Sequence, residues 1–181
     1  MEDSTLLKKE CKPEILTDYC VVDIETTGMS HVNNEIIEIS ALKIRDGMIA
    51  NSFSSLVKPV RGVNYFITRL TGISNKMLSD AATIDEVLPD FLSFIGNDVI
   101  LGHNIKFDLR FLRANCEKYL NIQLENESVD TLGLARKYSG APSCKLDSLA
   151  EFYGVNSSGH HRALRDCEMT YEIYKKMFRQ F

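Results

Sequence analysis

Two acidic residues, Asp23 and Glu25, stand two positions apart at the end of a short apolar run. Residues 19–24 have the composition of a buried β-strand, in which alternate side chains project from the same face of the sheet. The two carboxylates are therefore expected to lie side by side. Unpaired carboxylates in such a position repel each other and lose hydration, and a divalent cation is the usual remedy. The spacing is a weak signal on its own, because composition predicts about one Asp-x-Glu by chance.

Two aspartates on the apolar sides of predicted helices extend this acidic group. At about 100° per residue, Asp108 falls on the core-facing side of a helix over residues 105–120. Asp166 lies at the edge of the core-facing stripe of the last helix, whereas Glu168 of the same helix faces solvent. Oxygen donors favour Mg²⁺ or Mn²⁺ over zinc. Two such ions about 4 Å apart form the site at which many nucleases displace a phosphoryl group.

Histidine is the residue best suited to accept a proton from an attacking water at neutral pH. His103 and His161 each precede one of the aspartates by five residues, so the spacing alone does not choose between them. His103 follows a predicted strand in a tight loop and is interpreted more readily as a hydrogen-bonded structural residue. His160 is expected to be exposed. Lys145 and Arg162 flank the predicted site and are candidates for phosphate contacts.

The elements that must position these side chains follow from the pattern of apolar residues and turns. The expected strands are residues 19–24, 35–45, 48–57, 99–101 and 128–130. The expected helices are residues 83–95, 105–120, 132–138, 146–153 and 162–178. Thr83 and Glu86 match a capping box at the start of the first helix, Pro89 should kink that helix or delay its start, and residues 58–82 are expected to be a connecting region. A three-strand meander followed by alternating strands and helices predicts an α/β fold with a mixed five-stranded sheet flanked by helices.

Length, composition and charge limit the classes of protein to which the chain can belong. Its 181 residues, 44% hydrophobic and 25% charged, fit one globular domain over residues 18–181 after a polar leader over residues 1–17. No apolar run approaches the roughly 18 residues of a membrane helix, so no membrane partner is expected. Five scattered cysteines without a Cys-x-x-Cys pair indicate reduced thiols and a cytoplasmic location. A net charge of −4 argues against a nucleic-acid coat protein but not against a metal-dependent nuclease, whose ions supply positive charge.

Three segments together resemble the motifs of the DEDDh family of 3′-to-5′ exonucleases, which includes the proofreading epsilon subunit of bacterial replicative DNA polymerase. The segments are residues 23–28 (DIETTG), 103–108 (HNIKFD) and 161–166 (HRALRD), in the order found in the family. Each segment alone is a weak signal, but the resemblance extends over residues 18–178. It implies a ribonuclease-H-like fold and a 3′-to-5′ exonuclease that releases nucleoside 5′-monophosphates.

Residue roles follow from the same resemblance, which implies two Mg²⁺ or Mn²⁺ ions. The metal ligands that it assigns are Asp23, Glu25, Asp108 and Asp166. The general base that it assigns is His161, in preference to His103. The residues that it assigns to substrate binding are Thr26, Thr27, Gly28, Leu70, Thr71, Asn104 and Phe107.

The implied substrate is the 3′ end of single-stranded DNA, and a replicative DNA polymerase is a candidate partner. RNA is an alternative substrate, because no segment of the sequence identifies a pocket for the 2′-hydroxyl. A second alternative is a non-catalytic scaffold of the same fold that binds a polymerase or nucleic acid. Such a scaffold would not need all four acids and the histidine, and none of the five is missing from this sequence.

Overall fold

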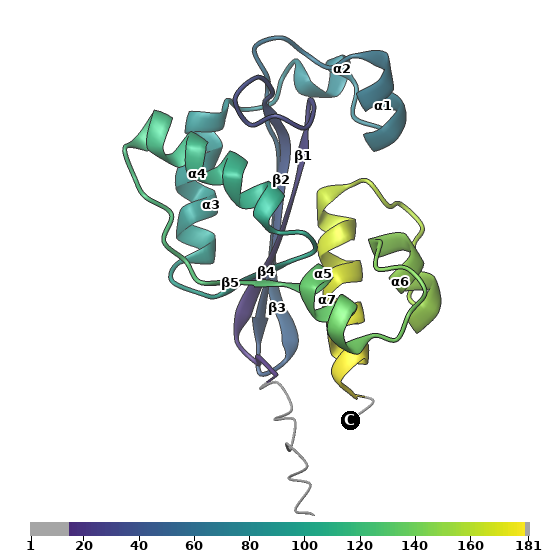
Figure 1. Cartoon of the computed structure of the whole chain (residues 1–181). Coiled ribbons are helices and arrows are strands. Elements are labelled where there is room, and N and C mark those ends of the chain that lie inside the picture. The colour runs from purple at the N-terminus through teal and green to yellow at the C-terminus, as the bar shows by residue number, and fades with distance from the viewer. Residues whose placement is uncertain (1–14, 180–181) are drawn as a thin grey trace, which may run out of the picture.

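The computed structural model describes residues 15–179, which form a five-stranded sheet with helices on both of its faces (Figure 1). The strands are β1 (Tyr19–Thr26), β2 (Ile36–Arg45), β3 (Met48–Leu56), β4 (Ile100–Gly102) and β5 (Ser128–Asp130). The helices are α1 (Tyr65–Thr71), α2 (Asn75–Leu78), α3 (Ile84–Ile95), α4 (Lys106–Leu120), α5 (Thr131–Tyr138), α6 (Leu146–Tyr153) and α7 (Ala163–Arg179). Most of the predicted leader, residues 1–14, lies outside the described residues. None of the helices described is both long and apolar enough to cross a membrane.

The sheet has the mixed topology that the sequence predicted. Its strand order is β3-β2-β1-β4-β5, in which β1, β2 and β3 are antiparallel neighbours while β4 and β5 run parallel to β1. A two-residue turn joins β2 to β3, and its residues Asp46 and Gly47 both have positive φ angles, of 50° and 70°, as a type I′ turn requires. In the β1–β2 register Glu25 lies opposite Glu38, so these two side chains project from the same face of the sheet.

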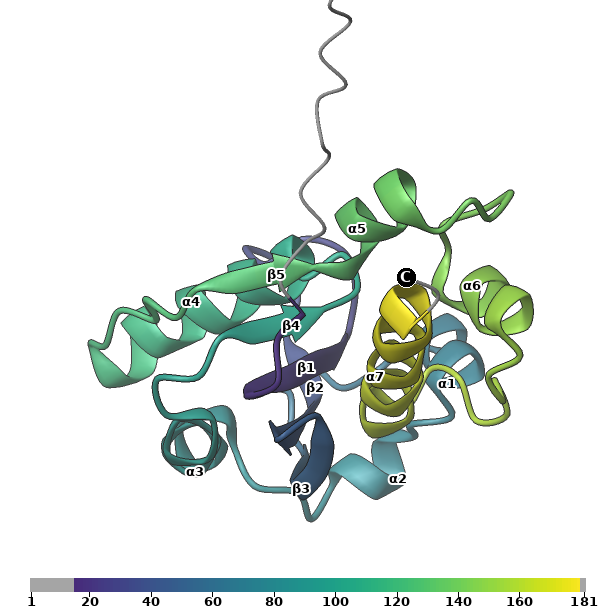
Figure 2. The ribbon, with the colours of Figure 1, turned by 90° about the horizontal axis from the view of Figure 1, so that it is seen from below.

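Alternate residues of β1 belong to two separate cores. Tyr19 and Val21 pack with side chains of α5, α6 and α7, whereas Cys20, Val22 and Ile24 pack with side chains of α3 and α4. Viewed from the end of the sheet, α7 covers one face while α3 and α4 cover the other (Figure 2). β1 is therefore a central strand that is buried on both faces.

The connecting region predicted over residues 58–82 contains two short helices, α1 and α2, so that prediction is wrong. α1 begins after Asn64, whose side chain accepts a hydrogen bond from the N–H of Ile67, and it ends at Gly72 with a φ of 73°. The two helices have seven and four residues, too few to establish an apolar repeat in the sequence. Both lie beyond the carboxyl end of β1 (Figure 1).

α3 begins where the capping box predicted it. The carboxylate of Glu86 accepts hydrogen bonds from the N–H of Thr83 at 2.8 Å and from the hydroxyl of Thr83 at 2.9 Å. The helix starts at Ile84, directly after Thr83. Pro89 lies inside the helix, so of the two expected effects, a kink or a late start, the late start is wrong. The helix continues through the proline because the side chains around it, Leu88 and Phe91, are fully buried against the sheet.

Candidate active site

Two carboxylates project from β1 toward α7. Asp23 and Glu25 continue the row of Tyr19 and Val21 along the strand, and both are half-buried. The intervening residue, Ile24, packs in the opposite core. The alternation that predicted a shared face for the two acids is therefore confirmed.

α7 brings a third carboxylate to the same place. Asp166 lies in the first turn of α7 and is 5% exposed. Carboxylate oxygens of Asp23, Glu25 and Asp166 all lie within 4.8 Å of one another. Because Mg²⁺ and Mn²⁺ prefer oxygen donors of this kind, the residues present fit a divalent cation.

Asp108 reaches the site from the opposite face of the sheet. The pairing of β4 with β1 extends to Val21, and β4 ends at Gly102. Just beyond this point, Oδ1 of Asp108 accepts a hydrogen bond from the N–H of Ile24 at 3.1 Å. Asp108 is buried, as its place on the helical wheel predicted. Among the described residues, Asp108 does not belong to the group formed by Asp23, Glu25 and Asp166, whose oxygens lie within 4.8 Å of one another. Its charge nevertheless helps to raise the pKa of Asp23.

Burial and crowding make these carboxyl groups weaker acids than usual. Burial raises the pKa of Asp23 well above its ordinary value, and the nearby charges of Asp108 and Asp166 raise it further. Burial, followed by the charge of Asp166, raises the pKa of Glu25 to about 8. Burial also raises the pKa of Asp108 to about 8, against the opposing effect of its backbone hydrogen bonds. A cation bound among these groups would relieve the repulsion and displace the protons.

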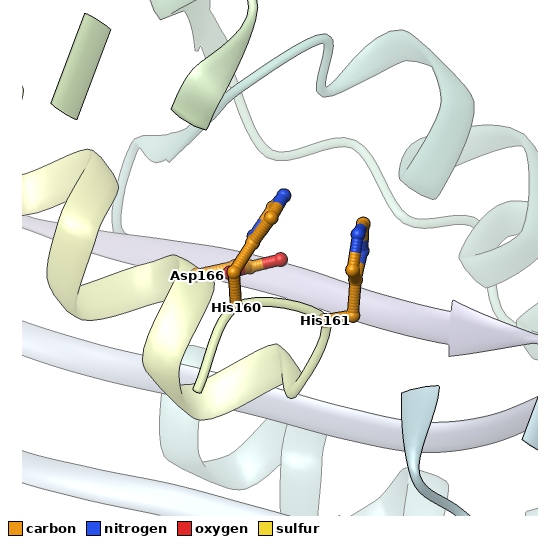
Figure 3. Close-up of side chains that lie close together, drawn as sticks. All are labelled: His160, His161 and Asp166. Carbon is orange, nitrogen blue, oxygen red and sulfur yellow. The ribbon is translucent and has the colours of Figure 1, made fainter. Parts of the chain in front are cut away.

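Two adjacent histidines stand beside Asp166 in the loop that leads into α7 (Figure 3). Their rings are stacked with centroids 3.8 Å apart, and Nδ1 of His160 lies 2.6 Å from Oδ1 of Asp166. The side chain of His160 is only 25% exposed, so the prediction of an exposed residue is wrong. The contact with Asp166 and the stack on His161 hold its ring against α7.

The histidines differ in their tendency to take up a proton. The hydrogen bond to Asp166 raises the pKa of His160, whereas burial and the neighbouring His160 lower the pKa of His161. The lowered pKa of His161 favours its neutral imidazole, which is the form that can accept a proton. His103 lies with Nδ1 3.0 Å from the hydroxyl of Thr131, a contact that agrees with its interpretation as a structural residue.

The segment that follows the β1 carboxylates forms a loop closed by its own hydrogen bonds. The hydroxyl of Thr26 donates to the carbonyl of Gly28 at 2.8 Å, and the hydroxyl of Thr27 accepts from the N–H of Glu35 at 3.0 Å. A Cβ atom on Gly28 would lie 2.5 Å from the side chain of Asn34. The loop therefore depends on small residues, and both of its hydroxyls are engaged within it.

The other residues assigned to substrate binding lie on separate elements. Leu70 is 42% exposed, whereas Thr71 beside it is buried and its hydroxyl is hydrogen-bonded within the turn that ends α1. Asn104 is exposed and has a φ of 60°. Phe107 is half-buried and packs on Phe111, with ring centroids 5.1 Å apart. Leu70 and Asn104 are thus accessible to a ligand, while the hydroxyl of Thr71 supports the fold.

A fifth carboxylate beside the site, that of Glu38 in β2, was not predicted from the sequence. It is 1% exposed and lies opposite Glu25. The guanidinium of Arg162 donates to both of its oxygens, at distances of 2.7 and 3.2 Å. The guanidinium of Arg162, which was a candidate for phosphate contacts, is thus paired with a carboxylate within the fold, while its side chain remains 43% exposed. The signal in the sequence was a glutamate inside an isoleucine-rich strand, at residues 35–45.

Comparison with known proteins places the chain among exonucleases. The exonuclease family matches residues 20–174. A DNA polymerase III PolC-type protein of Caldanaerobacter subterraneus subsp. tengcongensis is 44% identical over 169 residues, which are 93% of this chain and 12% of that protein. The DNA polymerase III subunit epsilon of Aquifex aeolicus is 37% identical over 163 residues, which are 90% of this chain and 81% of that protein. The chain thus spans a small part of the PolC-type relative and most of the epsilon subunit.

Solved structures share this architecture. Exonuclease X in complex with 5′ overhanging duplex DNA is 26% identical, with a TM-score of 0.74 over 90% of this chain and 92% of that one. The E. coli exonuclease I complex with single-stranded DNA, at 19% identity, shares the fold with a TM-score of 0.80 over 91% of this chain and 41% of that one. The fold is therefore ribonuclease-H-like. The family matches confirm the resemblance of the three motifs: this chain belongs to the exonuclease family, together with DNA polymerase III proteins of the PolC and epsilon types.

Proposed function

We propose that this chain removes nucleotides from the 3′ end of DNA and releases them as nucleoside 5′-monophosphates. The observation that carries the proposal is the convergence of three carboxylates within 4.8 Å, beside a histidine of lowered pKa. An oxygen-rich cation site next to a proton acceptor suits the hydrolysis of a phosphodiester. Membership of the exonuclease family supports attack at a chain end.

The acids of the site would hold two Mg²⁺ or Mn²⁺ ions. Their proposed ligands are Asp23, Glu25, Asp108 and Asp166. When bound, such ions lower the pKa of a water molecule and stabilise negative charge on a phosphate. Asp23 is the proposed central ligand, because the charges of the other three acids all act on its carboxyl group.

His161 is the proposed general base. Its lowered pKa favours the neutral imidazole, which would take a proton from the attacking water. His160 would hold the carboxylate of Asp166 by the contact of 2.6 Å and support the ring of His161 by stacking. In this proposal one histidine moves a proton while the other fixes its surroundings.

A single-stranded 3′ end is the proposed substrate, bound by the exposed Leu70 and Asn104, by Phe107, and by the segment of residues 26–28. The names of the relatives support DNA and a role in proofreading, because both the PolC-type and the epsilon protein are named for DNA polymerase III. The structure of exonuclease X contains duplex DNA with a 5′ overhang, which also supports DNA as the substrate class. A replicative DNA polymerase is accordingly the proposed partner.

Matched DNA and RNA oligonucleotides with a 5′ label test the substrate class. With Mg²⁺ or Mn²⁺, we expect a ladder of shortened DNA and a nucleoside 5′-monophosphate product, both of which EDTA should abolish. A ladder on RNA alone would move the function to RNA trimming with the same site. Failure to shorten either strand, despite measurable Mn²⁺ binding, would contradict catalysis by the isolated chain and favour a scaffold role.

A further inference from the structure

A buried ion pair joins β2 to the start of α7 beside the carboxylate site. The side chain of Glu38 is 2% exposed, and its Oε1 lies 2.7 Å from a terminal guanidinium nitrogen of Arg162. Nε of Arg162 donates to both carboxylate oxygens at 3.2 Å. The N–H of Ala163 also donates to Glu38, at 2.9 Å. Glu38 therefore binds two consecutive residues at the point where the loop becomes a helix.

Packing alone does not account for a carboxylate at this position. Burial of a charge is costly even when the charge is paired, and apolar residues of similar size often give equal stability. Glu38 also lies directly opposite Glu25, where two like charges on neighbouring strands oppose pairing. The adjacent residues of β2, Ile37 and Ile39, face the opposite side of the sheet, where they are fully buried. Ser40, on the same face as Glu38, is a buried polar residue without a charge. A buried glutamate at this position therefore indicates a use other than packing.

The segment that the ion pair anchors carries His161. Residues 154–162 form neither helix nor strand, and His161 has a φ of 68°, a conformation that is uncommon for a residue with a side chain. The position of its ring consequently depends on anchors within and beside the loop. Arg165 provides one, since its Nε donates to the carbonyl of Ser158 at 3.0 Å. The contacts of Glu38 provide the other, at the residue directly after His161.

We propose that Glu38 is a positioning residue, which fixes His161 beside the site carboxylates by holding Arg162 and the N–H of Ala163. The proposal rests on the role proposed above for His161. A guanidinium makes several hydrogen bonds to a carboxylate in one plane, whereas an ammonium group makes a point contact. The pair thus sets both the direction in which the chain enters α7 and the distance between the start of α7 and β2.

Glu38→Gln and Arg162→Lys remove the ion-pair geometry while they keep similar size and polarity. With Mg²⁺ and single-stranded DNA, each is expected to lower kcat by about tenfold or more, because the base is misplaced. KM and Mn²⁺ affinity should stay within about twofold of wild type, and the double variant should lose no more than either single variant. The control is Arg45→Lys, which alters a comparable contact of 2.6 Å with Asp98 at the other end of β2 and should keep the wild-type kcat.

Hydrogen–deuterium exchange of residues 155–162 provides a readout that does not require activity. Below the melting temperature of each protein, Glu38→Gln and Arg162→Lys should exchange faster in this segment, while Arg45→Lys should match wild type. Unchanged exchange, or a loss of kcat matched by an equal loss of Mn²⁺ affinity, would overturn the positioning role. If the wild-type protein digests no nucleic acid, the proposed function fails, and the exchange result still decides whether Glu38 holds the loop.

Discussion

At the scale of single residues, the site gathers carboxyl groups that oppose one another's ionisation. The pKa of Glu25 and that of Asp108 are both raised to about 8, chiefly by burial. The site therefore holds protons at pH 7 when no cation is bound. A divalent cation has to displace these protons, which couples metal affinity to pH.

Binding of Mn²⁺ is accordingly expected to release protons at pH 7, and to become tighter between about pH 6 and about pH 8. Calorimetric titration in two buffers of different ionisation enthalpy measures the release, because the displaced protons are taken up by the buffer. Glu168→Gln is the control, since this residue pairs with Arg165 on the outside of α7 and should not alter the release. Heats that are identical in both buffers would contradict the raised pKa values.

Removal of the proposed base should separate chemistry from metal binding. His161→Ala is expected to lower kcat by about 10²- to 10⁴-fold, with little change in Mn²⁺ affinity. His103→Ala, which loses the contact with Thr131, should keep most of the rate. Wild-type activity in the His161 variant would contradict its role. If the variant loses both Mn²⁺ binding and activity, His161 is instead a metal ligand, in the group that it can form with His160 and Asp166.

The acids of the site could be predicted from the sequence because strand alternation and helical periodicity are local properties of the chain. The helical wheel predicted that Asp108 and Asp166 face the core, and both are buried. The ion pair of Glu38 with Arg162 joins residues 124 positions apart. It depends on how α7 packs on the sheet, which no local pattern contains.

At the scale of elements, the site depends on where β4 stops and α4 starts. A Cβ atom on Gly102, the last residue of β4, would lie 2.8 Å from the carbonyl oxygen of Val22 and 2.5 Å from Cδ1 of Ile105. The Ile105 side chain can move, but the backbone of the central strand cannot move easily. Gly102 therefore allows β4 to approach β1 closely enough for Asp108 to bond to its backbone.

Gly102→Ala is expected to lower the free energy of unfolding by about 1–3 kcal/mol, as overpacking in a close-packed core does, and to weaken Mn²⁺ binding through Asp108. Urea denaturation measures the first effect. The matched control is Gly133→Ala in α5, where a Cβ atom meets nothing within 4 Å and helix propensity should add up to about 1 kcal/mol. Equal stabilities for the two variants would contradict the close approach at Gly102.

The long elements were predictable because each carries enough residues for its apolar repeat to be recognised. All five strands and the helices α3 to α7 lie near their predicted ranges. α1 and α2 were not predicted, since they are short and their ends are set by single capping residues, Asn64 and Ser74. Leu70, which is proposed to contact the end of the substrate, lies on α1. The apolar pattern of the sequence therefore did not predict the element that carries this residue.

At the scale of the whole molecule, the site carboxyls link folding stability to pH. A group whose pKa is higher in the folded protein contributes stability that is present at low pH and is lost as the pH rises through the folded pKa. For Glu25 and Asp108 the folded pKa is about 8. The metal-free protein should therefore lose this stability progressively between about pH 5 and about pH 8, where the folded state holds the protons and the unfolded state does not.

Mn²⁺ should oppose this loss, because it binds the folded state and replaces the displaced protons. Melting temperatures at both ends of the pH range, in EDTA and in excess Mn²⁺, measure the effect. We expect the gain from Mn²⁺ to be larger at the higher pH. A melting temperature in EDTA that stays level or rises across the range would show that the carboxyls do not hold their protons in the folded protein.

Asp23 is the residue on which the proposed chemistry depends most, because the other site acids all act on it. Asp23→Asn keeps the shape of the side chain but removes its charge and an anionic metal ligand. The most direct measurement is digestion of 5′-labelled single-stranded DNA with Mg²⁺ by the wild-type protein and by this variant. The proposed site predicts a ladder that shortens one nucleotide at a time with the wild-type protein, and no ladder with the variant or in EDTA. An equal ladder from the variant, a ladder that persists in EDTA, or cuts only at internal positions would contradict it.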